Sequence, residues 1–122
     1  MTIRVKEAFV ESMNEAEIRG VRVLKASMKE PNGTLMLELP EVLCGSLSTG
    51  DQVGIVIDDK PLKIDESVKL CAEGTVFEEV EMGGGYRVTA TIGGLRMVLE
   101  SADLSAAQRD TFSSGRFFVV LR

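Results

Sequence analysis

Hydrophobic and polar residues alternate with a period of two along most of the chain, which is typical of half-buried β-strands. The segment "YRVTATIG" (Tyr86 to Gly93) shows the cleanest alternation, and "RGVRVLKASM" (Arg19 to Met28) places Val21 and Val23 on one face and Arg22 on the other. The other segments with this period are 34–40, 51–58, 68–81, 95–100 and 116–122. The side chains expected to share the apolar faces are Leu35, Leu37 and Leu39; Val53, Ile55 and Ile57; Val68, Leu70, Ala72 and Val76; and Tyr86, Val88, Ala90 and Ile92.

Residues with turn-forming chemistry separate these segments. "EPNG" (Glu30 to Gly33) predicts a tight hairpin with Asn32 and Gly33 at its tip, and "MGGGY" (Met82 to Tyr86) joins two long strands. "STGD" (Ser48 to Asp51) precedes a strand. Seven or eight short strands at this spacing favour a closed or nearly closed antiparallel barrel.

Two segments depart from the strand pattern. "SADLSAAQRDTF" predicts one or two helical turns, because Ser105 and Gln108 have the spacing of a capping box. "DDKPLKIDES" (Asp58 to Ser67) is polar and contains Pro61, so we expect it to connect two halves of the sheet across the surface.

The pair Gly93-Gly94 interrupts an otherwise continuous strand pattern in "TIGGLRMVLE" (Thr91 to Glu100). Glycine adds no side chain to a strand, so a pair there indicates a tight hairpin, a sharp bend, or a place where another backbone comes close. We favour the hairpin or bend as the structure, with the flanking segment as part of a docking surface.

Length and composition predict one globular domain over residues 1–122. Hydrophobic residues make up 44% of the chain and charged residues 27%, and no apolar run approaches the ~20 residues that span a bilayer. The first residues carry no signal-peptide core, so we expect a soluble cytoplasmic protein without a membrane partner. The net charge of −5 argues against an autonomous nucleic-acid-binding protein.

Chemistry-bearing residues are sparse. The chain has no histidine, and its two cysteines, Cys44 and Cys71, cannot build a four-ligand zinc site, so both are expected to be reduced, buried thiols. The run "EEVE" (Glu78 to Glu81) is interpreted as a solvated strand end, and "MGGGY" lacks the spacing of a phosphate loop. We therefore predict no enzymatic activity, no cofactor, no metal and no small-molecule substrate.

Two surfaces remain as candidates for binding. Tyr86 and Arg87 form the one exposed-looking pair of an aromatic and a cationic residue, and are the candidate nucleic-acid contacts. In "LRMVL" the alternation turns Leu95, Met97 and Leu99 into the barrel and leaves Arg96 and Val98 for a partner, although an ordinary strand surface would look the same. Of the adjacent Phe117 and Phe118, at least one is expected in the core.

Three segments, in order, resemble a family of small RNA polymerase subunits, made up of the eighth subunit of the eukaryotic enzymes and its archaeal counterpart. They are "GTVFEEVE" (Gly74 to Glu81), "YRVTATIGGLRMVLE" (Tyr86 to Glu100) and "SSGRFFVVLR" (Ser113 to Arg122). "GGLRM" is the most recognisable string. The N-terminal half matches only in its pattern of strands, and the short 58–67 segment stands where eukaryotic members carry a long loop, which favours the archaeal form.

The resemblance implies an all-β fold, a small antiparallel eight-stranded barrel of oligonucleotide-binding (OB) type with one short helical turn. It also implies a non-catalytic accessory subunit of a DNA-dependent RNA polymerase that docks on and stabilises the largest subunit and contacts nucleic acid only weakly or indirectly. The expected docking residues are Gly93, Gly94, Arg96 and Val98. The alternative is a stand-alone OB-fold protein that binds single-stranded nucleic acid.

Overall fold

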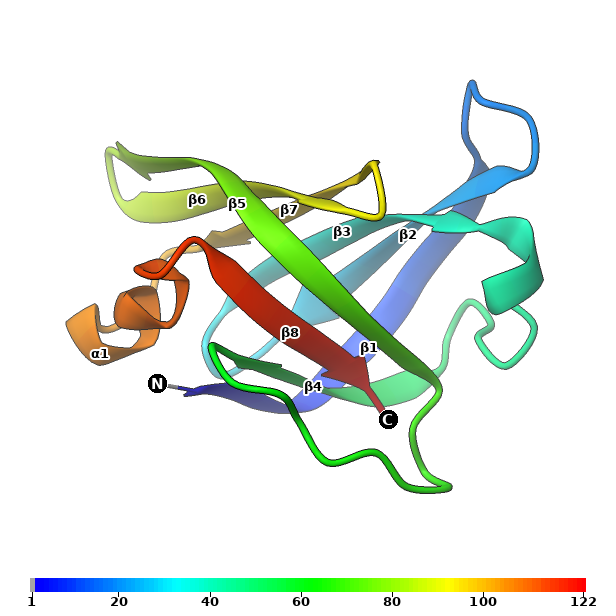
Figure 1. Ribbon diagram of the computed structural model, residues 1–122, viewed down its shortest axis with the longest axis horizontal. Coiled ribbons are helices and arrows are strands. Elements are labelled where there is room, and N and C mark those ends of the chain that lie inside the picture. Colours follow the sequence, from blue (N-terminus) through cyan, green and yellow to red (C-terminus); the bar gives the residue numbers. More distant parts are fainter. Residues whose placement is uncertain (1) are drawn as a thin grey trace.

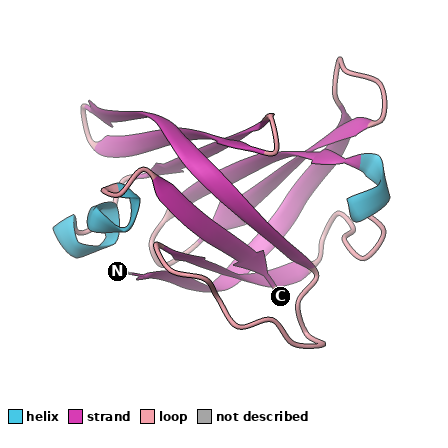
Figure 2. Cartoon of the chain, in the orientation of Figure 1, coloured by secondary structure: helices cyan, strands magenta, loops and turns pink. Residues whose placement is uncertain are grey.

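The computed structural model describes residues 2–122 as one closed antiparallel barrel (Figures 1 and 2). The strands are β1 (Thr2–Glu15), β2 (Val21–Met28), β3 (Gly33–Pro40), β4 (Gln52–Asp58), β5 (Leu70–Met82), β6 (Gly85–Ile92), β7 (Leu95–Ser101) and β8 (Arg116–Leu121). Three short helical segments complete the fold: η1 (Glu41–Leu43), α1 (Ala106–Arg109) and η2 (Asp110–Phe112).

The barrel closes through its first strand. The strand order is β1-β2-β3-β7-β6-β5-β8-β4, and β1 pairs with both β2 and β4. A register shift between Val10 and Ser12 lies where this long strand passes from one neighbour to the other, as β-bulges do at the corners of small barrels. The predicted fold class, all-β with a small antiparallel eight-stranded barrel and one short α-helix, is confirmed.

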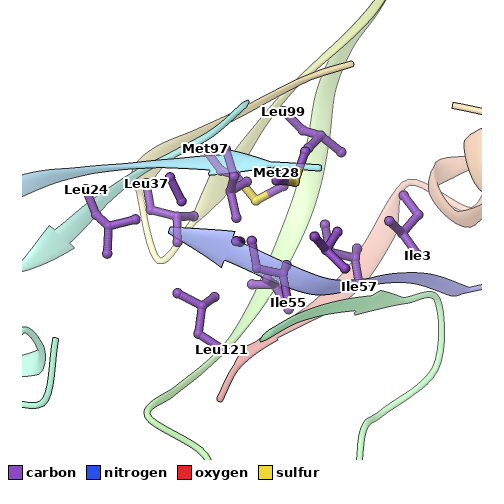
Figure 3. Packing of buried hydrophobic residues seen from close by; sticks show 14 of the residues in the cluster. Ile3, Leu24, Met28, Leu37, Ile55, Ile57, Met97, Leu99 and Leu121 are labelled. Atoms are coloured by element: carbon purple, nitrogen blue, oxygen red, sulfur yellow. The ribbon is translucent and has the colours of Figure 1, made fainter. Parts of the chain in front are cut away.

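The barrel interior holds the apolar residues that the alternation selects on most strands (Figure 3). The predicted inward sets of β3, β4 and β6 are all buried. In β2 the alternation holds, but its inward residues are Leu24, Ala26 and Met28, while Val21 and Val23 are only half-buried. In β5 the burial pattern is mixed, and Val68 precedes the strand.

Gly93 and Gly94 form the two-residue turn of the β6–β7 hairpin, which confirms the hairpin interpretation. Ile92 pairs with Leu95 across the turn, and the two glycines have φ values of +57° and +83°. A two-residue turn with positive φ at both central positions matches the right-handed twist of the strands, and glycine adopts it without steric cost. A side chain at either position would meet open space, so the requirement for glycine is one of backbone conformation.

The β2–β3 connection differs from the predicted Asn-Gly hairpin. Met28 pairs directly with Gly33, so Gly33 is already the first residue of β3 and the loop consists of residues 29–32, with a cis peptide bond between Glu30 and Pro31. Glycine is needed at position 33 for a different reason. A Cβ there would lie 2.0 Å from the backbone oxygen of Glu100 in β7.

The helical turn and the connecting loop lie as expected. Ser105 caps α1 through its side chain, which accepts from the Gln108 backbone N–H, and the Gln108 side chain accepts from the Ser105 backbone N–H. The β4–β5 connection, residues 59–69, contains no helix or strand.

The expectation of two buried thiols is half wrong. Cys44 is buried, and burial raises the pKa of its thiol. Cys71 is exposed, because it lies on the outward side of β5 and pairs with Val120 of β8. Neither cysteine forms a disulfide.

This difference predicts selective labelling. In the native protein, an aromatic disulfide reagent should modify Cys71 rapidly and Cys44 only on the timescale of opening, because a buried thiol with a raised pKa supplies little accessible thiolate. Spectrophotometric counting should give one reactive thiol per chain before denaturant is added and two after. Two rapidly reacting thiols in the native state would show that Cys44 is not buried.

Candidate functional site

The outer wall of the barrel is hollowed over strands β1, β2, β3, β7 and β6. The groove has a volume of about 550 Å³, and we refer to it as the outer groove. It is lined by Ser12, Asn14, Val23, Lys25, Thr34, Met36, Arg87, Thr89, Arg96, Val98 and Glu100. These residues occupy the outward positions between the core residues of their strands.

Strand register aligns the floor of the outer groove in one row. Ser12 pairs with Lys25, Lys25 with Met36, Met36 with Val98 and Val98 with Thr89, so that five adjacent strands each contribute one residue. Directly opposed side chains on one face of a sheet lie in contact distance of each other. The row therefore places the apolar Met36 and Val98 at its centre with polar side chains on both sides.

The charges in the outer groove are mostly positive. Lys25, Arg87 and Arg96 supply three cations, and Glu100 is the one carboxylate in the lining. Arg87 lies 3.9 Å from Glu100, whereas Lys25 and Arg96 have no ion-pair partner among residues 2–122. The groove thus carries net positive charge on a chain whose net charge is −5.

Strands β3 and β7 separate at one end of the outer groove. Their last paired residues are Leu37 and Met97, and beyond them the Arg96 backbone N–H donates to Glu38 Oε1 at 2.8 Å. The separation opens a second hollow of about 320 Å³, which Gly93 and Leu95 line together with Leu43 of η1. Val42, next to Leu43, is 88% exposed, so apolar surface continues beside the glycine turn.

The structure brings together three of the residues selected from the sequence. Arg87, Arg96 and Val98 all line the outer groove. Val98 is half-buried in the floor and is less exposed than expected. Gly93 and Gly94 lie at the adjoining turn and outside the groove lining.

Tyr86 is not part of this site, and the expectation that it is exposed is wrong. Its side chain is 8% exposed, because it alternates inward with Val88 while Arg87 turns outward. Its hydroxyl donates to Glu79, and its ring lies beneath Arg109, whose guanidinium carbon is 4.5 Å from the ring centroid. Arg109 also pairs with Glu81 at 2.5 Å. These contacts tie α1 to the β5–β6 hairpin.

We expect the pKa of Tyr86 to lie far above that of an ordinary tyrosine. Burial and the hydrogen bond to Glu79 raise its pKa, so the folded state favours the protonated phenol. This contribution to stability is complete below the unfolded pKa of about 10 and is lost as the pH rises above it. Because Tyr86 is the single tyrosine, absorbance at 295 nm reports it alone. We expect no tyrosinate signal near pH 10 while the circular dichroism remains native. If half of the Tyr86 hydroxyl were ionised at pH 10 in the folded protein, the burial of Tyr86 and its hydrogen bond to Glu79 would be contradicted.

Some residues of the surface were missed by sequence reasoning. Lys25 and Met36 complete the groove floor, and only the pairing of β2 with β3 and of β3 with β7 shows that they lie in one row with Val98. Phe77 is 75% exposed beside a register shift in β5, between Val76 and Glu78. No period-two pattern identifies a residue that a bulge turns outward.

The arrangement of the outer groove suits binding of an extended chain or strand. An open hollow with an apolar centre and flanking cations can cover apolar groups and pair with negative charges. Over the described part of the chain, no three His, Cys, Asp or Glu side chains are grouped closely enough to hold a metal ion. The helices between residues 2 and 122 are all too short to cross a membrane.

Comparison with known proteins identifies no family. No protein-family model and no curated protein matches the chain. Among solved structures, it is similar to the cytoplasmic molybdate-binding protein ModG, determined with molybdate bound, at 12% sequence identity and a TM-score of 0.37. The alignment covers 98% of this chain and 89% of that one. A likeness at this level carries no argument about function.

Proposed function

We propose that this chain is a non-catalytic accessory subunit of a DNA-dependent RNA polymerase, the archaeal counterpart of the eukaryotic eighth subunit, which docks on the largest subunit and stabilises it. The docking surface consists of the outer groove and the adjoining Gly93-Gly94 turn. The observation that carries the proposal is the convergence of Arg87, Arg96 and Val98 in one groove, since they come from the segment with the strongest resemblance.

The placement of the resembling segments supports the proposal. Residues 74–81 lie on β5, residues 86–100 form the β6–β7 hairpin, and residues 113–122 contain β8. These four strands are consecutive in the barrel in the order β7-β6-β5-β8 (Figure 1). The resemblance therefore falls on one continuous half of the wall, and β7 and β6 bring it to the outer groove.

The chemistry of the surface also supports docking. Met and Arg are enriched at the centres of protein interfaces, and Met36 lies in the groove with Arg87 and Arg96. The two glycines of the turn carry no Cβ and have open space around them, so a partner can approach their backbone closely. No catalytic group is needed for this function.

Affinity purification from a native lysate, followed by mass spectrometry, tests the proposal. The tagged full-length chain should recover the largest polymerase subunit together with the other core subunits, in amounts that remain after a high-salt wash. Recovery of the chain without polymerase subunits, from cells in which the polymerase is intact and detectable in the lysate, would refute it.

A second candidate, binding of single-stranded nucleic acid, is favoured by the three cations of the outer groove. No aromatic side chain lines this groove, whereas single-strand-binding grooves stack bases on aromatic rings. We therefore expect only non-specific affinity, with dissociation constants of roughly 10⁻⁴ to 10⁻⁶ M at physiological salt. Fluorescence anisotropy with a labelled oligonucleotide distinguishes the two, because nanomolar binding would favour the second candidate.

A further inference from the structure

A separate hollow lies on the wall formed by β1, β4 and β8, under the connection from β4 to β5. Its volume is about 330 Å³, and we refer to it as the basic hollow. It is lined by Arg4, Val5, Lys6, Gly54, Ile55, Val56, Leu62, Lys63, Val120 and Arg122. Figure 1 shows the connecting loop passing along the outside of the barrel near β4 and β8.

The floor of the basic hollow is apolar, and the β4–β5 loop covers part of this outward face of the sheet. Val120 lies on the outward side of β8, opposite Val56 of β4 and the exposed Cys71 of β5, yet it is only 1% exposed. Leu62 of the loop shares the hollow with both valines. The loop is held there by Arg122, whose guanidinium donates to the Lys63 backbone oxygen at 3.1 Å and lies 3.5 Å from Asp65.

The rim of the basic hollow is cationic. Arg4, Lys6, Lys63 and Arg122 line it, and no aspartate or glutamate does. Arg122 is paired with Asp65 beside the hollow, but the other three cations have no ion-pair partner among residues 2–122. On a chain with a net charge of −5, unpaired cations around an apolar floor indicate complementarity to a negative partner.

We propose that the basic hollow binds an extended segment of a partner protein in which acidic residues alternate with aliphatic ones. An aliphatic side chain would lie on the half-buried Val56 and Leu62, and the neighbouring carboxylates would pair with the cations of the rim. This surface is distinct from the outer groove, and its use does not depend on the polymerase assignment.

Two observations favour a peptide over other anions. The lining contains no aromatic side chain on which a nucleobase could stack. The surface is also hollowed past the basic hollow, because Arg4 and Lys6 line a neighbouring hollow of about 400 Å³ together with Glu7, Lys29 and Glu30, and Lys29 pairs with Glu7 at 3.7 Å. A continuous path of this kind suits an extended chain more than a compact small molecule.

A synthetic peptide tests the inference on the full-length protein. The probe is acetyl-Asp-Leu-Asp-Leu-Asp-amide, titrated at low salt while amide chemical shifts are followed by NMR. We expect saturable shifts at Gly54, Val120 and residues 62–63. The double variant Arg4→Gln, Lys6→Gln should weaken binding about tenfold, since it removes two partly exposed charge pairs. The matched double variant Arg19→Gln, Arg116→Gln removes the same charge at two exposed positions that line neither the basic hollow nor the outer groove, and should bind as wild type.

Two further probes separate the contributions. A peptide with Asn in place of every Asp, and one with Gly in place of every Leu, should each bind more weakly than the original. Absence of saturable binding, equal binding of the Asn peptide, or unchanged affinity of the Arg4, Lys6 variant would overturn the proposal. Tighter binding of a uridine oligonucleotide than of the peptide, with shifts at the same amides, would also overturn it and assign the hollow to nucleic acid.

Discussion

A single methyl group at Gly33 should lower the free energy of unfolding by about 3 kcal/mol, at the upper end of the range for overpacked sites. In Gly33→Ala the new Cβ would lie 2.0 Å from the Glu100 backbone oxygen and 2.9 Å from the Ser101 Cα. Both atoms belong to the backbone of β7, which is paired with β6 on its other side. The strand cannot move away without breaking one of these pairings, so the clash is not relieved by a rotamer change.

Urea unfolding followed by circular dichroism measures this effect. Gly54→Ala is the matched control, because Gly54 also lies within a strand and its added Cβ would make one ordinary contact, 3.7 Å from the Val5 backbone oxygen. We expect the control to change stability by no more than a few tenths of a kcal/mol, typical of a tolerated surface substitution. Equal stabilities for the two variants would show that β3 and β7 are not this close.

Charge reversal in the outer groove should weaken association with the largest polymerase subunit by about 2 kcal/mol or more, which is roughly 30-fold. In the double variant Lys25→Glu, Arg96→Glu, the groove loses two cations that have no partner within the described chain and gains two carboxylates beside Glu100. Both side chains are exposed in the isolated chain, so we expect the barrel to remain folded.

The yield of polymerase subunits that co-purify with the tagged variant measures this loss. Arg19→Glu combined with Lys60→Glu makes the same change in net charge at two exposed cations outside the groove, and should leave the yield unchanged. Circular dichroism of each isolated variant verifies the fold. If the control loses as much as the groove variant, only overall charge matters and the outer groove is not the docking surface.

The sequence predicted the barrel well where one face of a strand is apolar and the other is polar. In β6 and β3 the alternation identifies the interior residues, and the Gly93-Gly94 turn follows from the two strands that it joins. The alternation was less informative in β2, since Val21 and Val23 on the outward side are as apolar as the inward Leu24 and Ala26. Period alone does not say which of two apolar faces points inward.

Other errors have physical causes that lie outside the local sequence. Gly33 is required by the neighbouring strand β7, where it pairs with the distant Ser101, and not by a turn. Cys71 lies on an outward position that the β4–β5 loop does not cover, while Val120 opposite it is covered. Tyr86 is buried because Glu79 and Arg109 satisfy its hydroxyl and ring face.

The candidate site could be predicted only in part for the same reason. Arg96 and Val98 follow from alternation along β7, but Lys25 and Met36 enter the groove through pairing between strands that are distant in sequence. The basic hollow depends on the β4–β5 loop. The sequence of this loop has no periodic pattern from which its path could be predicted, since residues 59–69 form neither helix nor strand. Such sites become visible only when register and loop position are known.

Site-specific photo-crosslinking in cells reports whether the outer groove contacts the largest polymerase subunit. A photoreactive benzoylphenylalanine in place of Asn14, which is exposed at the edge of the outer groove, should form an adduct with the largest polymerase subunit. The same residue in place of Phe77, which is 75% exposed and lies outside the groove lining, should form little or none. A folded Asn14 variant that gives no adduct with the largest subunit after irradiation would show that the outer groove is not the docking surface.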